Sequence, residues 1–292
     1  VDPELLATLT AQTNVDCFGG STGSVTVTAT PGSGTAPYSY SIDGGATWQG
    51  SGTFSGLAAG NYTVIVRDAL LCSINVPVTI TQYAVLNATV SFTHVTCFGA
   101  NNGTITISSP QGGSGSYEYT VNGGISWQSG GSFTGLGPGT YNVQIRDAAA
   151  TACVIVLNPA LVITEPPVLS ATVTSTNVTC FGANNGTITI SNPQGGYGTY
   201  QYSINGGVTW QAGGNFTALF PGNYNVRIRD ALYPGCFIVL NPALVITQPA
   251  ILNATVTSTN VTCFGANNGT ITISNPQGGY GTYEYSINGG IA

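Results

Sequence analysis

Several residue types are scarce or absent in this sequence. It has no lysine, no methionine and one histidine, and only 5% of its 292 residues are charged. Four arginines stand against ten acidic residues, which gives a formal net charge of −6. So few positive charges cannot neutralise a phosphate backbone, so we expect no nucleic-acid partner. Isopeptide crosslinks need a lysine and are excluded.

Long apolar runs are lacking as well. No window approaches the roughly 18 uninterrupted apolar residues of a transmembrane helix, so we expect no membrane insertion. The sequence begins V-D-P-E-L-L, without a methionine or a visible signal peptide, and we expect it to be part of a longer chain. Its 15 Tyr, 10 Phe and 3 Trp supply enough apolar surface to offset the entropy of folding.

The sequence repeats itself. The segment N-V-D-C-F-G-G-S-T-G-S-V-T-V-T begins at Asn14, and close copies begin at His94, Asn177 and Asn260. A period of this length suits a small autonomous domain better than a solenoid unit. We therefore predict four tandem domains, 1–81, 82–165, 166–248 and 249–292, of which the last is the N-terminal part of a truncated repeat. Short linkers, two of them with proline, should join them semi-rigidly.

Each repeat alternates apolar and polar residues with period two, as in T-I-T-I-S around Ile188 and Ile190. This pattern predicts half-buried strands, and glycine-rich turns separate about seven of them per repeat. We therefore predict an all-β fold of tandem immunoglobulin-like β-sandwiches with antiparallel strands. In each complete repeat a tyrosine lies at the start of a strand just after a corner, which resembles the tyrosine corner of such folds. These tyrosines are Tyr62, Tyr141 and Tyr224.

Seven cysteines occur, two in each complete repeat and one in the last. Metal sites usually have closer cysteine pairs, so we favour one disulfide within each repeat. The predicted pairs are Cys17 with Cys72, Cys97 with Cys153, and Cys180 with Cys236, while Cys263 has its partner beyond the chain end. Such a bridge stabilises a domain by about 4 kcal/mol in the chain-entropy model and persists only in an oxidising compartment. The protein is therefore expected to be exported.

The segment S-I-D-G-G-A-T-W-Q, Ser41 to Gln49, has the spacing of the Asp-box hairpin of sialidases. Its sister copies carry Asn122 and Asn205 where this one has Asp43, so a charge is not required there. A tight turn explains the shared residues, and the arginine cluster and nucleophile of a sialidase are missing. We expect no enzyme activity, no catalytic residues, no metal site and no cofactor.

Three other recurring features could have a function. Trp48, Trp127 and Trp210 could stack on sugar rings, which would make the chain an array of carbohydrate-binding modules. The alternative is that each closes its own hairpin or the adjoining domain junction. The Arg-Asp pairs 67–68, 146–147 and 229–230 are interpreted as anchors of the following loop, with a ligand or cation contact as the alternative. The single histidine, His94, replaces an asparagine of the other copies and is expected at an exposed loop position.

The motifs V-T-C-F-G-A-N-N-G-T-I-T-I, G-G-Y-G-T-Y-Q-Y-S-I-N-G-G and L-F-P-G-N-Y-N-V-R-I-R-D, followed by a second cysteine, closely resemble the SprB-type repeat. This repeat occurs in many copies in very large surface adhesins of gliding and biofilm-forming Bacteroidota. The resemblance covers the chain from about Asn14 onward. It implies type IX secretion, a location on the cell surface or in a secreted filament, and a role in adhesion, gliding or biofilm formation, with the repeats as the stalk.

The sequence thus predicts a non-enzymatic extracellular stalk or fibre. Lysines, which usually guard exposed sheet edges, are absent, so bulges, loops, glycans or other chains must cover those edges. The expected partners are neighbouring repeats, other copies of the chain in a fibre, and surface or glycan ligands.

Overall fold

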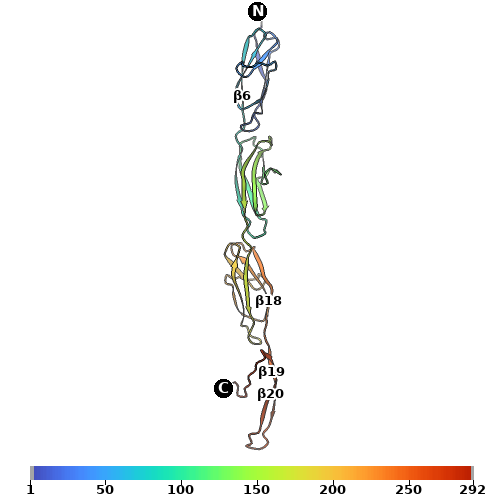
Figure 1. Ribbon diagram of the computed structural model, residues 1–292, viewed down its shortest axis with the longest axis vertical. Helices are drawn as coiled ribbons and strands as arrows, with labels where there is room; N and C mark the ends of the chain where they lie inside the picture. The colour runs from blue at the N-terminus through green and yellow to red at the C-terminus, as the bar shows by residue number, and fades with distance from the viewer. Residues whose placement is uncertain (1–2, 291–292) are drawn as a thin grey trace. The chain divides into compact units, whose positions relative to one another are not determined.

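A computed structural model describes residues 3–290. The regular secondary structure of these residues consists entirely of β-strands (Figure 1). That part of the chain contains no helix long and apolar enough to cross a membrane. The chain divides into two compact units: Val1–Val95 with Asn101–Thr164, and Thr96–Ala100 with Glu165–Ala292. The predicted all-β fold is confirmed, whereas the four domain boundaries stay a prediction.

The first repeat forms two three-stranded antiparallel sheets. Its strands are β1 (Ala7–Thr13), β2 (Gly23–Ala29), β3 (Ser39–Ser41), β4 (Thr53–Leu57), β5 (Gly60–Arg67) and β6 (Ser73–Ile80). One sheet has the order β1-β2-β4 and the other β3-β5-β6. In immunoglobulin letters these are A-B-E and C-F-G, the arrangement of an immunoglobulin-like sandwich.

The second and third repeats have the same topology. Their strands are β7 (Asn87–Thr93), β8 (Gly103–Gln111), β9 (Tyr117–Thr120), β10 (Ser132–Leu136), β11 (Gly139–Asp147) and β12 (Val154–Ile163), then β13 (Ser170–Thr176), β14 (Gly186–Gln194), β15 (Tyr200–Ser203), β16 (Asn215–Leu219), β17 (Gly222–Asp230) and β18 (Phe237–Ile246). The fourth repeat contributes the hairpin of β19 (Ala250–Thr259) and β20 (Thr270–Gly279).

Each complete repeat has six strands in the described chain, one fewer than the estimate of about seven. The segment that could have formed the seventh follows the tryptophan hairpin. It makes a single bridge, between Tyr40 and Gln49 in the first repeat, with the same pairing at Tyr119 and Gln128. The glycines that follow end the pairing before a strand forms.

The core of each sandwich comes from the alternation seen in the sequence. In the first repeat, Val25 and Val27 of β2 face Val64 and Val66 of β5, and all four are at most 1% exposed. Isoleucine and valine take the same places in the third repeat. β-branched side chains pack well on a pleated surface, which explains why this small core is rich in them.

The predicted tyrosine corner is present in all three complete repeats. The Tyr62 hydroxyl donates a hydrogen bond to the carbonyl oxygen of Ala58, four residues upstream, at 3.0 Å. Tyr141 donates in the same way to Gly137 at 2.9 Å, and Tyr224 to Phe220 at 2.8 Å. The bond fixes the corner between the fourth and fifth strands of each repeat.

The edge strands contain no lysine, but prolines and register shifts protect them from pairing with another chain. The last strand of each complete repeat is an edge strand and contains a proline, at Pro77, Pro159 or Pro242. The first strand, on the edge of the other sheet, shifts register along its partner in every complete repeat. A proline cannot donate a ladder bond and a bulge twists the edge, so both discourage pairing with another chain.

Candidate functional site

Both disulfides of the described chain join different repeats. Cys17 is bonded to Cys153, and Cys97 to Cys236, each with a Cα–Cα distance of 5.3 Å. Each bond therefore joins the first cysteine of one repeat to the second cysteine of the next. The predicted pairs Cys17–Cys72, Cys97–Cys153 and Cys180–Cys236, and with them one disulfide within each repeat, are wrong.

The strand topology explains why pairing within a repeat fails. Cys17 lies in the loop after β1, and the amide of Val15 in that loop donates to the carbonyl of Thr81, just past the end of β6. Cys72 directly precedes the start of β6. An eight-residue strand is about 26 Å long, whereas bonded cysteines need Cα atoms within about 7 Å. The two cysteines therefore lie at opposite ends of their sandwich.

The first-cysteine loop, Cys-Phe-Gly, is held by the linker that follows its own repeat. The amide of Gly19 donates to the Gln82 side-chain oxygen at 2.7 Å. Glu165 accepts from Gly99 at 2.7 Å, and Gln248 accepts from Gly182 at 2.9 Å. Gln82, Glu165 and Gln248 were not predicted as site residues. Their recurrence at the end of I-T-Q or I-T-E in each repeat was a signal that could have identified them.

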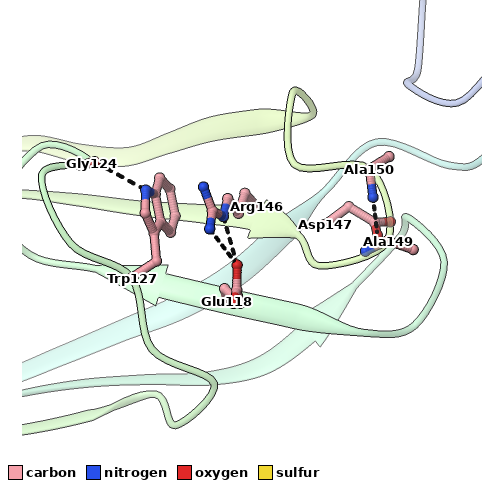
Figure 2. Close-up of polar contacts among 7 residues, drawn as sticks. All are labelled: Glu118, Gly124, Trp127, Arg146, Asp147, Ala149 and Ala150. Atoms are coloured by element: carbon pink, nitrogen blue, oxygen red, sulfur yellow. Dashed lines mark hydrogen bonds and ion pairs between the residues drawn. The ribbon is translucent and has the colours of Figure 1, made fainter.

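The second-cysteine loop is held by a buried aspartate. Asp147 is fully buried at the end of β11, and it accepts hydrogen bonds from the Ser114 hydroxyl at 2.7 Å and from the amides of Ala149 and Ala150 at 2.8 and 3.3 Å. Figure 2 shows Asp147 turned toward the two alanine amides of the loop that leads to Cys153. The carboxylate thus fixes the approach to the disulfide.

The same anchor recurs in the other complete repeats. Asp68 is 4% exposed and accepts from the amides of Leu70 and Cys72, at 3.0 and 2.9 Å. Asp230 is fully buried and accepts from the amides of Leu232 and Tyr233 at 2.8 and 3.1 Å. For the aspartates of the Arg-Asp pairs, the interpretation as loop anchors is confirmed.

The hydrogen bonds to Asp147 lower the pKa of its carboxyl group, and the packing around that group requires a glycine at position 113. Burial opposes ionisation of this carboxyl group, but hydrogen bonds from Ser114, Ala149 and Ala150 outweigh it and hold its pKa below the ordinary value. Gly113 has a φ of +59°, and a Cβ there would meet an Asp147 oxygen at 2.5 Å. Glycine is therefore required beside the anchor.

The arginine before each anchor points to the other face of its strand. Arg146 forms an ion pair with Glu118 at 2.6 Å, and its guanidinium lies 4.4 Å from the centroid of the Trp127 ring (Figure 2). In the first repeat, Arg67 lies 3.7 Å from the ring centroid of Trp48. In the third, Arg229 lies 4.4 Å from that of Trp210. One face of each half-buried indole ring is therefore covered by a cation.

The tryptophans also bond to their own hairpins. The indole N–H of Trp48 donates to the carbonyl of Gly45 at 2.9 Å, and Trp127 and Trp210 do the same to Gly124 and Gly207. These contacts favour hairpin closure as the role of the tryptophans. The prediction of sugar stacking stays untested, and no contact of the described residues supports it.

The Asp-box segment forms a self-contained turn. The Asp43 carboxylate accepts from the Thr47 hydroxyl at 2.6 Å, from the Thr47 amide at 2.9 Å and from the Ser41 hydroxyl at 2.7 Å. The hydroxyl and amide of Thr47 hold the pKa of Asp43 far below its ordinary value. Asn205 makes the equivalent bonds in the third repeat, accepting from the amide of Thr209 at 3.0 Å and donating to its hydroxyl at 2.7 Å.

Asp43→Asn should therefore leave the midpoint of thermal unfolding unchanged at pH 7. The new amide can accept from the Thr47 amide and donate to the Thr47 hydroxyl, as in the sister repeats. Circular dichroism during heating measures this. Asp43→Ala removes both bonds and is the control that should lower the midpoint. A marked loss with asparagine would show that the charge itself is needed.

The remaining candidates behave as loop residues. His94 is exposed, and its Nδ1 accepts from the Thr164 amide at 3.1 Å, as the side-chain oxygen of Asn177 does from Thr247 at 2.9 Å. Across residues 3–290, no three histidine, cysteine or acidic side chains are placed to hold a metal ion. Cys72, Cys180 and Cys263 are exposed and unpaired within the same range.

The chain has distant likenesses among solved structures. It is similar to the three N-terminal domains of the bacteriophage RB49 highly immunogenic outer capsid protein, at 11% identity over 84% of this chain and 96% of that one, with a TM-score of 0.34. It is also similar to a tetra-tandem repeat from the extending region of a large adhesion protein, at 14% identity over 94% and 89% of the two chains, with a TM-score of 0.23. Likenesses this distant carry no argument about function.

The sequence matches a protein family but no individual curated protein. No curated protein matches the chain. The family model of the SprB repeat matches four times, at residues 9–47, 89–125, 172–209 and 255–291, which together make up just over half of the sequence. Each of the first three matched segments contains the first cysteine of its repeat, and the fourth contains Cys263.

Proposed function

Because the chain belongs to the SprB repeat family, we propose that it is the stalk of a cell-surface adhesin, an extracellular and non-enzymatic array of sandwich domains. The coarser conclusion, that it is a repeat protein of the adhesin type, follows from the four family matches. The finer proposal is that it lies at the cell surface and acts there as a stalk.

The observation that carries this proposal is the disulfide between successive repeats. A bond such as Cys17–Cys153 covalently joins two domains that already share a linker. Such bonds persist in oxidising surroundings outside the cytosol. A covalent joint at the junction is useful where a chain of domains must stay in one piece.

The networks of buried and paired side chains support a role without catalysis. The buried aspartates are fully engaged in holding the loops, and the arginines lie against tryptophan rings. The Asp-box residues bond to one another within their turn. Within residues 3–290, the titratable groups of these networks thus have structural partners.

We further propose export by type IX secretion, with roles in adhesion, gliding or biofilm formation. These proposals rest on the family resemblance. Association of several copies into a fibre and binding of surface or glycan ligands are also proposals. Prolines and bulges on the edge strands supply part of the protection that lysine would give, so fibre formation is not needed to cover those edges.

The location can be tested on intact cells of the source organism. An antibody raised against residues 82–165 should label unpermeabilised cells or filaments shed from them, and external protease should remove the label. A cytosolic protein in the same cells should resist the protease until lysis. Label that appears only after lysis would contradict the proposed surface stalk.

Cells that produce the protein without these repeats should test the role. If the repeats act as a stalk, their deletion should lower attachment to a surface while the rest of the protein is still exported. Unchanged attachment, with the shortened protein detected on the surface, would contradict the stalk role.

A further inference from the structure

The disulfides create a covalent route through the repeats that is much shorter than the chain. The route starts at Cys72, continues along β6 and β7 to Cys97, crosses the disulfide to Cys236, and continues along β18 and β19 to Cys263. It contains 25 peptide bonds before the disulfide and 27 after it, and it bypasses the 138 residues between Cys97 and Cys236.

The residues on this route lie mostly in strands. Of the residues between Cys72 and Cys97, fifteen belong to β6 and β7, and β18 and β19 contribute ten each after the disulfide. A strand already rises about 3.3 Å per residue, against a maximum of about 3.6 Å for a fully stretched chain. The strands of the route can therefore lengthen by only about a tenth before covalent bonds bear the load.

A second route has the same design. Cys17 is joined to Cys153, and from there the chain runs through β12 and β13 to Cys180. The two routes alternate, so that the second repeat contributes its first strand, β7, to one route and its last strand, β12, to the other. The four inner strands, β8 to β11, lie in sequence between Cys97 and Cys153 and belong to neither route.

We propose that these two routes bear tension along the array and make it almost inextensible, while the inner strands of each repeat carry no load. That the array bears tension at all rests on the proposed stalk function, whereas the routes themselves follow from the pairing of the cysteines alone. A repeat in such an array could lose its fold under force and still not release as slack the residues between its two cysteines, 55 in the second repeat.

Pulling on the chain between Cys72 and Cys263 tests this inference. Both are exposed and unpaired in the described chain, so maleimide-linked DNA handles can be attached there once Cys180 is replaced by serine. With disulfides intact, the protein part of the tether should never exceed about 190 Å at high force in optical tweezers. A reducing agent should release the bypassed residues, and the contour length should rise to about 690 Å, a more than threefold gain.

Two double variants in the same Cys180→Ser background separate the routes. Cys97→Ser with Cys236→Ser opens the pulled route, and the limit should rise to about 590 Å, because Cys17–Cys153 still shortens the path a little. Cys17→Ser with Cys153→Ser also removes one disulfide, but it lies off the pulled route. Its limit should stay at about 190 Å.

A limit of about 490 Å before reduction would overturn the inference, because that length corresponds to a bond between Cys97 and Cys153. Any other extension well beyond 190 Å with oxidised cysteines would overturn it too. These outcomes concern only the covalent connections, so they leave the surface labelling and attachment experiments to decide the proposed function.

Discussion

Asp147→Ala is expected to destabilise the second repeat by about 3 kcal/mol, since a hydrogen bond to a buried charged group contributes roughly 1.5–3 kcal/mol and several are lost together. The amides of Ala149 and Ala150 would lose their acceptor, and so would the Ser114 hydroxyl. Urea unfolding of the oxidised chain, followed by fluorescence, measures the loss. Asp43→Asn, an exposed carboxylate with equivalent asparagines in sister repeats, is the matched control and should unfold like the parent.

The same carboxylate should make stability depend on pH. Because the pKa of Asp147 is lowered in the folded state, its contribution is fully present above the ordinary value of 3.8 and is lost as the pH falls below it toward the folded-state pKa. The Asp147→Ala variant should therefore lose less stability than the parent between pH 5 and about pH 2. If the free energies of unfolding of the two proteins changed equally with pH across that range, the role given to the carboxylate would be contradicted.

The second large effect concerns the junction disulfide. Cys97→Ser with Cys236→Ser should lower the free energy of complete unfolding by about 5 kcal/mol in the chain-entropy model, because the bond closes a loop of 139 residues. Guanidinium unfolding without reducing agent measures this, and the third repeat should then unfold independently of the second. Cys180→Ser, which removes a cysteine unpaired in the described chain, is the control and should change little.

Peptide mapping without reduction checks the pairing directly. Fragments that contain Cys17 and Cys153 should appear linked, and so should those that contain Cys97 and Cys236. Fragments that link Cys17 to Cys72 would restore pairing within repeats and remove the basis of the predicted 5 kcal/mol effect.

Features set by neighbouring residues could be predicted from the sequence. The alternation around Ile188 and Ile190 gave the strands, and the corner before Tyr224 gave the turn with its hydrogen bond. The hairpin of Ser41 to Gln49 was predicted from its asparagine-bearing sister copies. In the corner and in the hairpin the hydrogen bonds join residues four apart in sequence, and the alternation that predicts a strand is itself a local pattern.

The disulfide partners depend on three-dimensional placement, and spacing misled the prediction. Two cysteines in each complete repeat favoured one disulfide per domain, but Cys97 and Cys153 lie in loops at opposite ends of a sandwich. A cysteine spacing that repeats with every domain fits pairing within a repeat and pairing between neighbours equally well. The orientation of β12 between the two loops decides the question.

The pairing of successive repeats also fixes an order of events during synthesis. Cys17 must remain a thiol until Cys153, 136 residues later, has emerged and its loop has folded. Cys72 emerges first and is a competing partner in the unfolded chain. Early folding of the first repeat, which separates Cys17 from Cys72 by the length of β6, would protect against the wrong bond. Oxidation of such an array therefore lags behind its folding by more than one repeat.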